Sequence, residues 1–141
     1  MKQMIFSKME HRRRLENAKK LMAEKDLKAI FLVGDTTVGE NFHGNFRYFA
    51  DNRVIFNRQT MLLFPDGHTI ALAGSYVAFE ALLLRSAAKE TRLISSNVLE
   101  SMKDLLKEKG IEAGRIGTVL DTISVKWMQQ MNLLLPGIEW V

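Results

Sequence analysis

The sequence predicts an α/β domain in which a mixed β-sheet of about six strands is flanked by helices. Strand-like and helix-like segments alternate along the 141 residues, and a Pro-Asp-Gly turn joins two of the strands directly. Alternation of this kind is typical of sheets covered by helices, and the direct turn adds an antiparallel pair. A chain of this length fits one domain, whose folding buries about 70% of the surface of the unfolded chain.

The first elements have clear local signals. Residues 7–10, SKME, form a capping box in which Ser7 accepts from the backbone and Glu10 reaches back to it. Apolar residues follow at helical spacing, so a helix is predicted over about 7–25. The unbroken apolar run AIFLV at 29–33 predicts a strand that is buried on both faces of the sheet.

The remaining elements are bounded by turn and capping residues. The Pro-Asp-Gly turn between two apolar runs is the strongest local signal and predicts a β-hairpin. Ser75 and Asn97 are helix caps, and Gly110 and Pro136 are stop signals. The predicted strands are 55–64, 69–73, 91–95, 115–120 and 138–141, with the turn at 65–68, and the predicted helices are 75–88, 97–110 and 124–137.

Composition and charge restrict the function. The chain has no cysteine, which excludes disulfides, thiolate metal sites and a cysteine nucleophile. No apolar run approaches the ~20 residues of a membrane helix, and the N-terminus is charged where a signal peptide is apolar, so a cytoplasmic location is expected. The net charge of +4 arises in residues 1–28, where interleaved glutamates indicate a solvated, self-paired helix face rather than a nucleic-acid surface.

The residues that could carry chemistry do not combine into a catalytic set. The histidines His11, His43 and His68 have no spacing of a metal site. The stretch SAAK at 86–89 matches a Ser-x-x-Lys pattern without its partner motifs. GDTTVG at 34–39 lacks the ending and the glycine spacing of phosphate loops. No catalytic residue and no metal ligand is therefore assigned to this chain.

The segment NFHGNFRYFADNRVIF at 41–56 is the candidate for binding. It holds five of the twelve aromatic residues of the chain. In an extended stretch alternate residues share a face. The pattern then predicts one set of side chains in the core, Phe46, Tyr48 and Ala50, and another set facing outward, Arg47, Phe49 and Asp51.

Arginine beside exposed aromatic rings suits a carboxylate, because its planar fork pairs bidentately with one. The same arginine could pair with Glu40 or Asp51 instead. Binding groups concentrate on loops, and this segment begins like one. The predicted substrate-contact residues are Phe42, His43, Arg47, Phe49 and Arg53.

The order of these segments resembles the N-terminal domain of the creatinase, prolidase and aminopeptidase P family, the pita-bread metallopeptidases. The stretches that carry the resemblance are KAIFLV, NFRYFADNR, FPDGHTIAL and RIGTVLD, followed by LLPGIEWV. In that family a strand is followed by Asn-Ile-Arg-Tyr-Leu-Thr-Gly-Phe. Residues 45–49 match the first five positions in type, whereas Ala-Asp-Asn at 50–52 departs from the rest.

The resemblance implies a ribonuclease-H-like mixed sheet and a C-terminal catalytic domain that residues 1–141 do not contain. That domain would hold two divalent metal ions (manganese, cobalt or zinc) between Asp, His and Glu ligands. The present chain would be a single N-terminal domain that builds a homodimer interface, narrows the active-site mouth and is inactive alone. The end on the apolar strand IEWV also suggests a domain from a longer protein.

The intact protein would then be an Xaa-Pro dipeptidase or aminopeptidase P-like hydrolase that acts on a peptide or small-molecule substrate. Three alternatives stay open. The first is a non-catalytic protein-binding module of the same fold, and the second is a creatinase-like hydrolase of a small molecule. The third is a nucleic-acid-binding domain, which salt-dependent binding to duplex DNA would identify.

Overall fold

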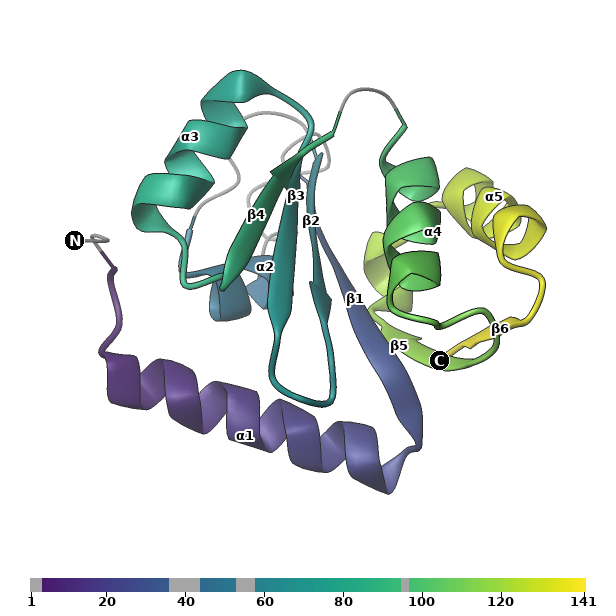
Figure 1. Cartoon of the computed structure of the whole chain (residues 1–141), viewed down its shortest axis with the longest axis horizontal. Helices are drawn as coiled ribbons and strands as arrows, with labels where there is room; N and C mark the ends of the chain where they lie inside the picture. The colour runs from purple at the N-terminus through teal and green to yellow at the C-terminus, as the bar shows by residue number, and fades with distance from the viewer. Residues whose placement is uncertain (1–3, 36–43, 53–57, 95–96) are drawn as a thin grey trace.

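A six-stranded mixed sheet with the strand order β4-β3-β2-β1-β5-β6 forms the centre of the computed structural model (Figure 1). The structure describes residues 4–35, 44–52, 58–94 and 97–141. The strands are β1 (Leu27–Asp35), β2 (Arg58–Leu63), β3 (Thr69–Ala73), β4 (Glu90–Leu93), β5 (Gly114–Thr118) and β6 (Ile138–Trp140). β2 is antiparallel to both of its neighbours, and the other three pairings are parallel. The predicted mixed sheet is confirmed.

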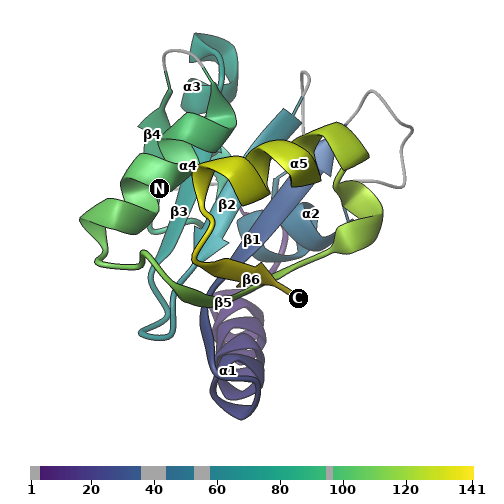
Figure 2. The same cartoon turned by 90° about the vertical axis from the view of Figure 1, so that its right-hand side faces the viewer.

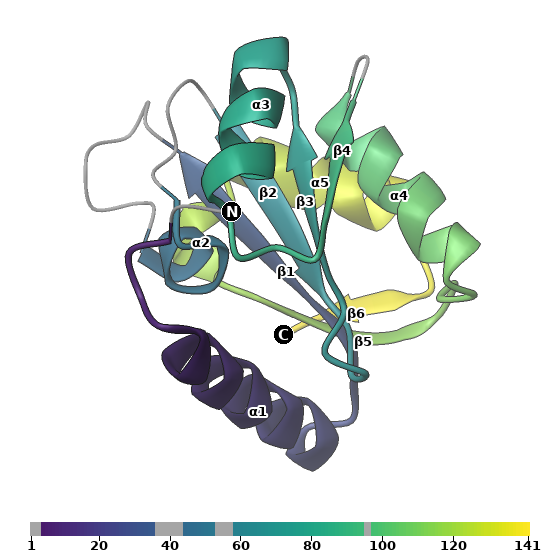
Figure 3. The same cartoon turned by 60° about the vertical axis from the view of Figure 1, so that its left-hand side comes forward.

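Helices cover both faces of this sheet. Among the described residues they are α1 (Lys8–Glu24), α2 (Gly44–Ala50), α3 (Tyr76–Arg85), α4 (Val98–Glu108) and α5 (Val125–Leu134), with a short 3-10 helix η2 (Leu120–Thr122). α4 and α5 lie over one face (Figure 2), and α1, α2 and α3 lie over the other (Figure 3). All but α2 among the α-helices are predicted by the sequence. Within the described ranges, no helix is both long and apolar enough to cross a membrane.

The predicted caps form, with one exception. The side chains of Ser7, Ser75 and Asn97 each accept a hydrogen bond from the first turn of the helix that follows. Glu10, however, does not complete the predicted capping box. Its carboxylate accepts from the guanidinium groups of Arg13 and Arg14 instead.

Side chains of the strands alternate between two apolar cores. In β1, Phe31 and Val33 face α4 and α5, whereas Leu32 faces the other helices. All three are at most 3% exposed, so the run AIFLV is buried on both faces as predicted. The hairpin between β2 and β3 is also confirmed, because the backbone N–H of Phe64 donates to the carbonyl of His68 over 2.9 Å.

Residues 44–50 form a helix where the sequence pattern predicts an extended stretch. Phe46 and Ala50, four positions apart, are fully buried as predicted, but Tyr48 is 38% exposed and the predicted outward Asp51 is 2% exposed. Aromatic residues favour strands, which explains the wrong period. β1 and β2 pair directly with each other, so the chain between them cannot add a strand there.

Gly137 provides a test of the packing where β6 begins. A Cβ at this position would lie 2.6 Å from the carbonyl oxygen of Glu112 and 3.2 Å from the Cβ of Ala113. Because backbone would have to move, we expect Gly137→Ala to lower the free energy of unfolding by about 1–3 kcal/mol in urea denaturation. Gly74→Ala is the control, since its Cβ would meet nothing within 4 Å. Equal losses in both variants would contradict this account.

An ion-pair network joins β4 to α4. The guanidinium of Arg92 donates to both oxygens of Glu108, over 2.7 and 2.9 Å, and also to Glu90. These hydrogen bonds from Arg92 hold the pKa of Glu108 and the pKa of Glu90 below their usual range, and His68 contributes to the latter. Carboxylates whose pKa is lower in the folded state stabilise it above their unfolded pKa of about 4.3.

We therefore expect Arg92→Met to reduce stability near pH 7 and to have a smaller effect in acid. The stabilisation by the two carboxylates begins to fall below about pH 4.3 and is lost as the pH passes through their lowered pKa values in the folded state, so the gap between wild type and variant should narrow. Urea denaturation across this range measures the gap, which salt should also reduce. Lys107→Met is the control, because Lys107 makes no ion pair within the described chain. A gap that is independent of pH would refute the prediction.

Candidate functional site

Arg14 ties α1 to the segment that the sequence identifies as a candidate for binding. Its side chain is buried, and the guanidinium lies between two aromatic rings, 4.0 Å from the centroid of Phe6 and 4.1 Å from that of Tyr48. Nε donates to Glu10 over 2.8 Å, and Nη1 donates to the backbone carbonyl of Tyr48 over 2.6 Å. That carbonyl lies in the last turn of α2, where helical partners are missing, so Arg14 caps α2.

Glu10 keeps this arginine paired. Hydrogen bonds from Arg13 and Arg14 lower the pKa of Glu10 to about 2, so that the carboxylate remains charged in moderately acidic solution as well as at neutral pH. Glu16 pairs with Lys19 in the same way, over 3.0 Å. The predicted self-pairing of charges along α1 is therefore present.

Asp51 forms a second tie at the end of α2. Its backbone adopts a left-handed conformation, with φ of 54°, which ends the helix. Oδ2 accepts from the backbone N–H of Ile5 (2.7 Å), from that of Phe6 (3.1 Å) and from Nε2 of His11 (3.1 Å). One buried carboxylate thus fixes the residues that precede α1, and the first turn of α1 itself, against the end of α2.

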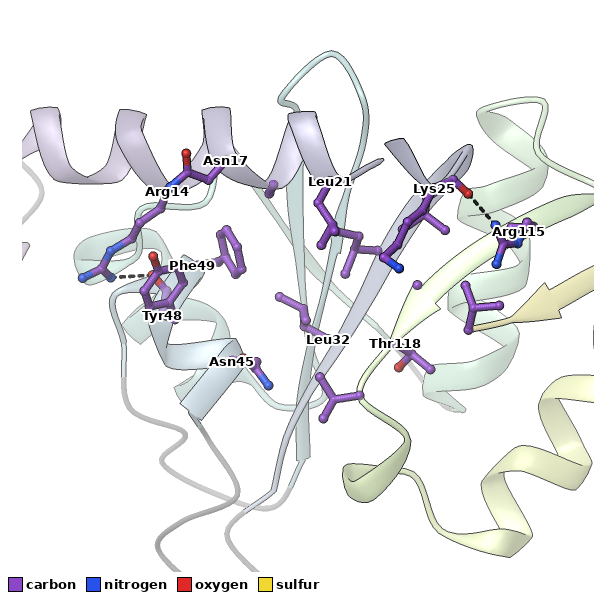
Figure 4. A pocket seen from close by; sticks show the side chains of 16 residues that line it. Arg14, Asn17, Leu21, Lys25, Leu32, Asn45, Tyr48, Phe49, Arg115 and Thr118 are labelled. Atoms are coloured by element: carbon purple, nitrogen blue, oxygen red, sulfur yellow. Dashed lines mark hydrogen bonds between the residues drawn. The ribbon is translucent and has the colours of Figure 1, made fainter. Parts of the chain in front are cut away.

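A groove of about 450 Å³ opens beside these two ties, between α1, α2, β1 and β5 (Figure 4). Arg14 and Tyr48 lie at one end of it, Lys25 and Arg115 lie at the other, and Leu32 lies between them. Most of its wall is apolar, from Leu21, Leu27, Ile30, Leu32, Tyr48, Phe49, Val119 and Val141. The size and the apolar lining are those of a binding site.

The charged side chains that line the groove are all basic. Arg14 is already paired with Glu10, and Arg115 donates to the carbonyl of Lys25 over 2.7 Å and lies 3.3 Å from Glu139. The ammonium group of Lys25 is the one lining cation without an ion pair within the described chain. The groove therefore offers apolar surface and a single uncommitted positive charge, which suits binding rather than proton transfer.

The predicted substrate-contact residues are only partly brought together. Phe49 is half-buried, packs on the core and lines the groove, with its ring 5.0 Å from that of Tyr48. Arg47 is half-buried on the same helix but does not line the groove, and within the described chain its side chain forms no ion pair or hydrogen bond. Phe42, His43 and Arg53 lie outside the described residues.

Arg14 and Asp51 are the site residues that the sequence does not identify. Arg14 follows Glu10 at the spacing of an ordinary surface pair, which gives no sign of its burial. Asp51 contacts residues 46 and 45 positions earlier in the chain, beyond the range of local pattern. The departure from Thr-Gly-Phe at 50–52 is the signal that could have drawn attention to Asp51.

Across the described ranges, no three His, Asp or Glu side chains are grouped so that they could hold a metal ion. His11 is engaged by Asp51, and His68 lies 3.1 Å from Glu90. No hydrolytic step is assigned to the described residues.

The contribution of the Asp51 hydrogen bonds to the free energy of unfolding can be separated from the cost of its left-handed backbone. We expect Asp51→Ala to lower the free energy of unfolding by about 3 kcal/mol or more, because three donors lose a charged acceptor. Asp26→Ala is the matched control: its φ is 50°, but its carboxylate is exposed and meets only Lys28. That variant should cost about 1 kcal/mol, the penalty of a left-handed alanine. Similar losses in urea denaturation would mean that Asp51 is not a structural tie.

Known structures share the fold of this chain. An Xaa-Pro dipeptidase from Bacillus anthracis superposes with a TM-score of 0.72 at 14% identity, over 93% of this chain and 33% of that one. An XXA-Pro aminopeptidase from Streptococcus pyogenes superposes with a TM-score of 0.70 at 20% identity, over 96% of this chain and 92% of that one. A dipeptidase from Pyrococcus horikoshii OT3 superposes with a TM-score of 0.62 at 21% identity, over 91% of this chain and 33% of that one.

The chain thus spans about a third of the length of the Bacillus anthracis protein. A search of curated protein sequences finds no match. The family model described as the Creatinase/Prolidase N-terminal domain matches residues 14–141. The match covers nearly the whole chain and agrees with the resemblance seen in the sequence, so the protein belongs to the Creatinase/Prolidase N-terminal domain family.

Proposed function

We propose that this chain is the N-terminal domain of a metal-dependent Xaa-Pro peptidase, and that it serves dimerisation and active-site capping rather than hydrolysis. The observation that carries the proposal is the family match over residues 14–141. It is supported by the fold that the chain shares with structures of Xaa-Pro dipeptidases and aminopeptidases. In this proposal a separate catalytic domain holds the two divalent ions (manganese, cobalt or zinc) and cleaves the bond before proline.

In this proposal the chain contacts the substrate through α2 and the segments that adjoin it. Arg14 and Asp51 fix the C-terminal end of α2, so that its side chains are presented from a firmly held element. We assign substrate contact to Arg47 and Phe49 on α2, together with Phe42, His43 and Arg53 in the adjoining sequence. The planar fork of an arginine is suited to the terminal carboxylate of a short peptide.

The proposal that hydrolysis belongs to a separate catalytic domain can be tested with the purified chain. Incubated with an Xaa-Pro dipeptide and manganese, cobalt or zinc ions, the chain should release no proline above a blank without protein. The physical reason is that its described residues offer no metal centre that could activate water. Chromatographic measurement of free proline, with and without a chelator, gives the result. Chelator-sensitive turnover at about 1 s⁻¹ or faster, typical of enzymes, would overturn the proposal.

The capping role needs a protein that carries this domain together with a metal-binding catalytic domain. There, Arg47→Ala should raise KM for dipeptides with a free carboxylate while leaving their amides and the bound metal unaffected. Lys107→Ala, on the outer side of α4, is the control. An unchanged KM would show that Arg47 does not contact the substrate. Activity on a small amidine-like compound instead of Xaa-Pro peptides would favour a creatinase-like hydrolase.

A further inference from the structure

The helix α3 is apolar on both sides, although only one side is buried. Its sequence is YVAFEALLLR, and its inner side packs against β3 and β4 through Ala78 and Leu82. The other side, called here the α3 outer face, carries large apolar side chains that are 44–70% exposed: Tyr76, Val77, Leu83 and Leu84. A helix that is hydrophobic all round is normally covered on both sides. The α3 outer face therefore lacks a partner within the described chain.

The neighbouring edge strand extends this apolar surface. In the parallel pairing of β3 with β4, Leu93 lies beside Ala73, which faces the core under α3. Leu93 is 39% exposed on that same side of the sheet. The next helix along the chain, α4, differs, because its outer positions Lys103, Asp104 and Lys107 are charged. α3 therefore differs from α4, although apolar side chains are also exposed on α5, where Val125 and Leu133 lie at the surface.

Two charges on α3 indicate what could cover it. Val77, Ala81 and Leu84 follow one another at spacings of four and three, the spacing of core positions in paired helices. Glu80 and Arg85 flank this stripe on its opposite sides, and neither forms an ion pair within the described chain. When two such helices lie side by side and parallel, each Glu80 comes opposite Arg85 of the other helix. The face is therefore complementary in charge to itself.

We propose that the α3 outer face is a contact between two copies of this chain, in which their α3 helices pair side by side about a two-fold axis. This inference builds on the dimerisation in the proposed function and names the surface that performs it. α3 covers β3 and β4, at the sheet edge opposite β6 and Val141 (Figures 1 and 3). The charge complementarity of the stripe to itself favours a second copy as the occupant.

The expected affinity follows from the size of the contact. A helix of ten residues is about 15 Å long. Two such helices bury less surface than the roughly 1,600 Å² of a standard interface, so the contact alone should be weak. Association is then expected only at high protein concentration, and the measurement must extend to about 1 mM.

Sedimentation analysis of the whole chain up to about 1 mM tests the proposal. The wild type should form a reversible dimer, and Leu84→Glu should weaken it at least about tenfold because a charge enters the stripe. Leu133→Glu is the control, since Leu133 is 81% exposed on α5, which covers the other face of the sheet. Because both side chains are exposed, the two variants should keep the wild-type circular dichroism spectrum.

Charge reversal tests the pairing itself. Glu80→Arg alone and Arg85→Glu alone should each weaken the dimer, and the double variant should restore it. A dimer that survives Leu84→Glu, or a double variant that stays weak, would overturn the paired α3 helices and leave dimerisation to another surface. The inference would be overturned if the chain were monomeric at every concentration or formed only larger aggregates. A chain that is always monomeric would also count against dimerisation by this domain.

Discussion

The tie between α1 and the end of α2 is the contact on which the position of the candidate site depends. α2 has only seven residues, which is too short for a helix to be stable by itself in water. Phe46 and Ala50 anchor it in the core, but the burial of these side chains does not fix where the helix ends. Arg14 and Asp51 supply that constraint, since the first caps the last turn and the second holds the chain that leads into α1. The wall of the groove is therefore a product of contacts between distant segments.

Buried polar atoms that lower stability lie beside this site, whereas the strands beneath it are stabilised by apolar packing. Asn52 and Gln59, on either side of residues 53–57, are buried, and side-chain polar atoms of both lack a hydrogen-bond partner among the residues that the structure describes. Each such atom costs about 1–3 kcal/mol. By contrast, the strands beneath carry fully buried apolar residues from both cores. Departures from full satisfaction of polar groups are typical of functional regions. Asn52 and Gln59 adjoin the sequence with the predicted contact residues, whereas Trp140, whose Nε1 is in the same condition within the described ranges, lies on β6.

The sequence predicts the elements well where the signal is local. Ser7, Ser75 and Asn97 cap their helices, and the Pro-Asp-Gly turn forms its hairpin, because the donors and acceptors lie within four residues. The candidate site is different. Its sequence predicts the wrong period because aromatic residues favour strands in general, whereas α2 is set by packing on β1. The groove is lined from four elements and the C-terminal residue, so that no stretch of sequence describes it.

The groove and the α3 outer face lie on the same side of the sheet but at different ends of the strand order. The groove lies over β1 and β5, and α3 lies over β3 and β4, with β2 between them. A second copy seated on α3 would not need to cover the groove. The proposed capping and the proposed dimerisation would then use separate surfaces of one small domain, and a substitution in one surface should leave the other role intact.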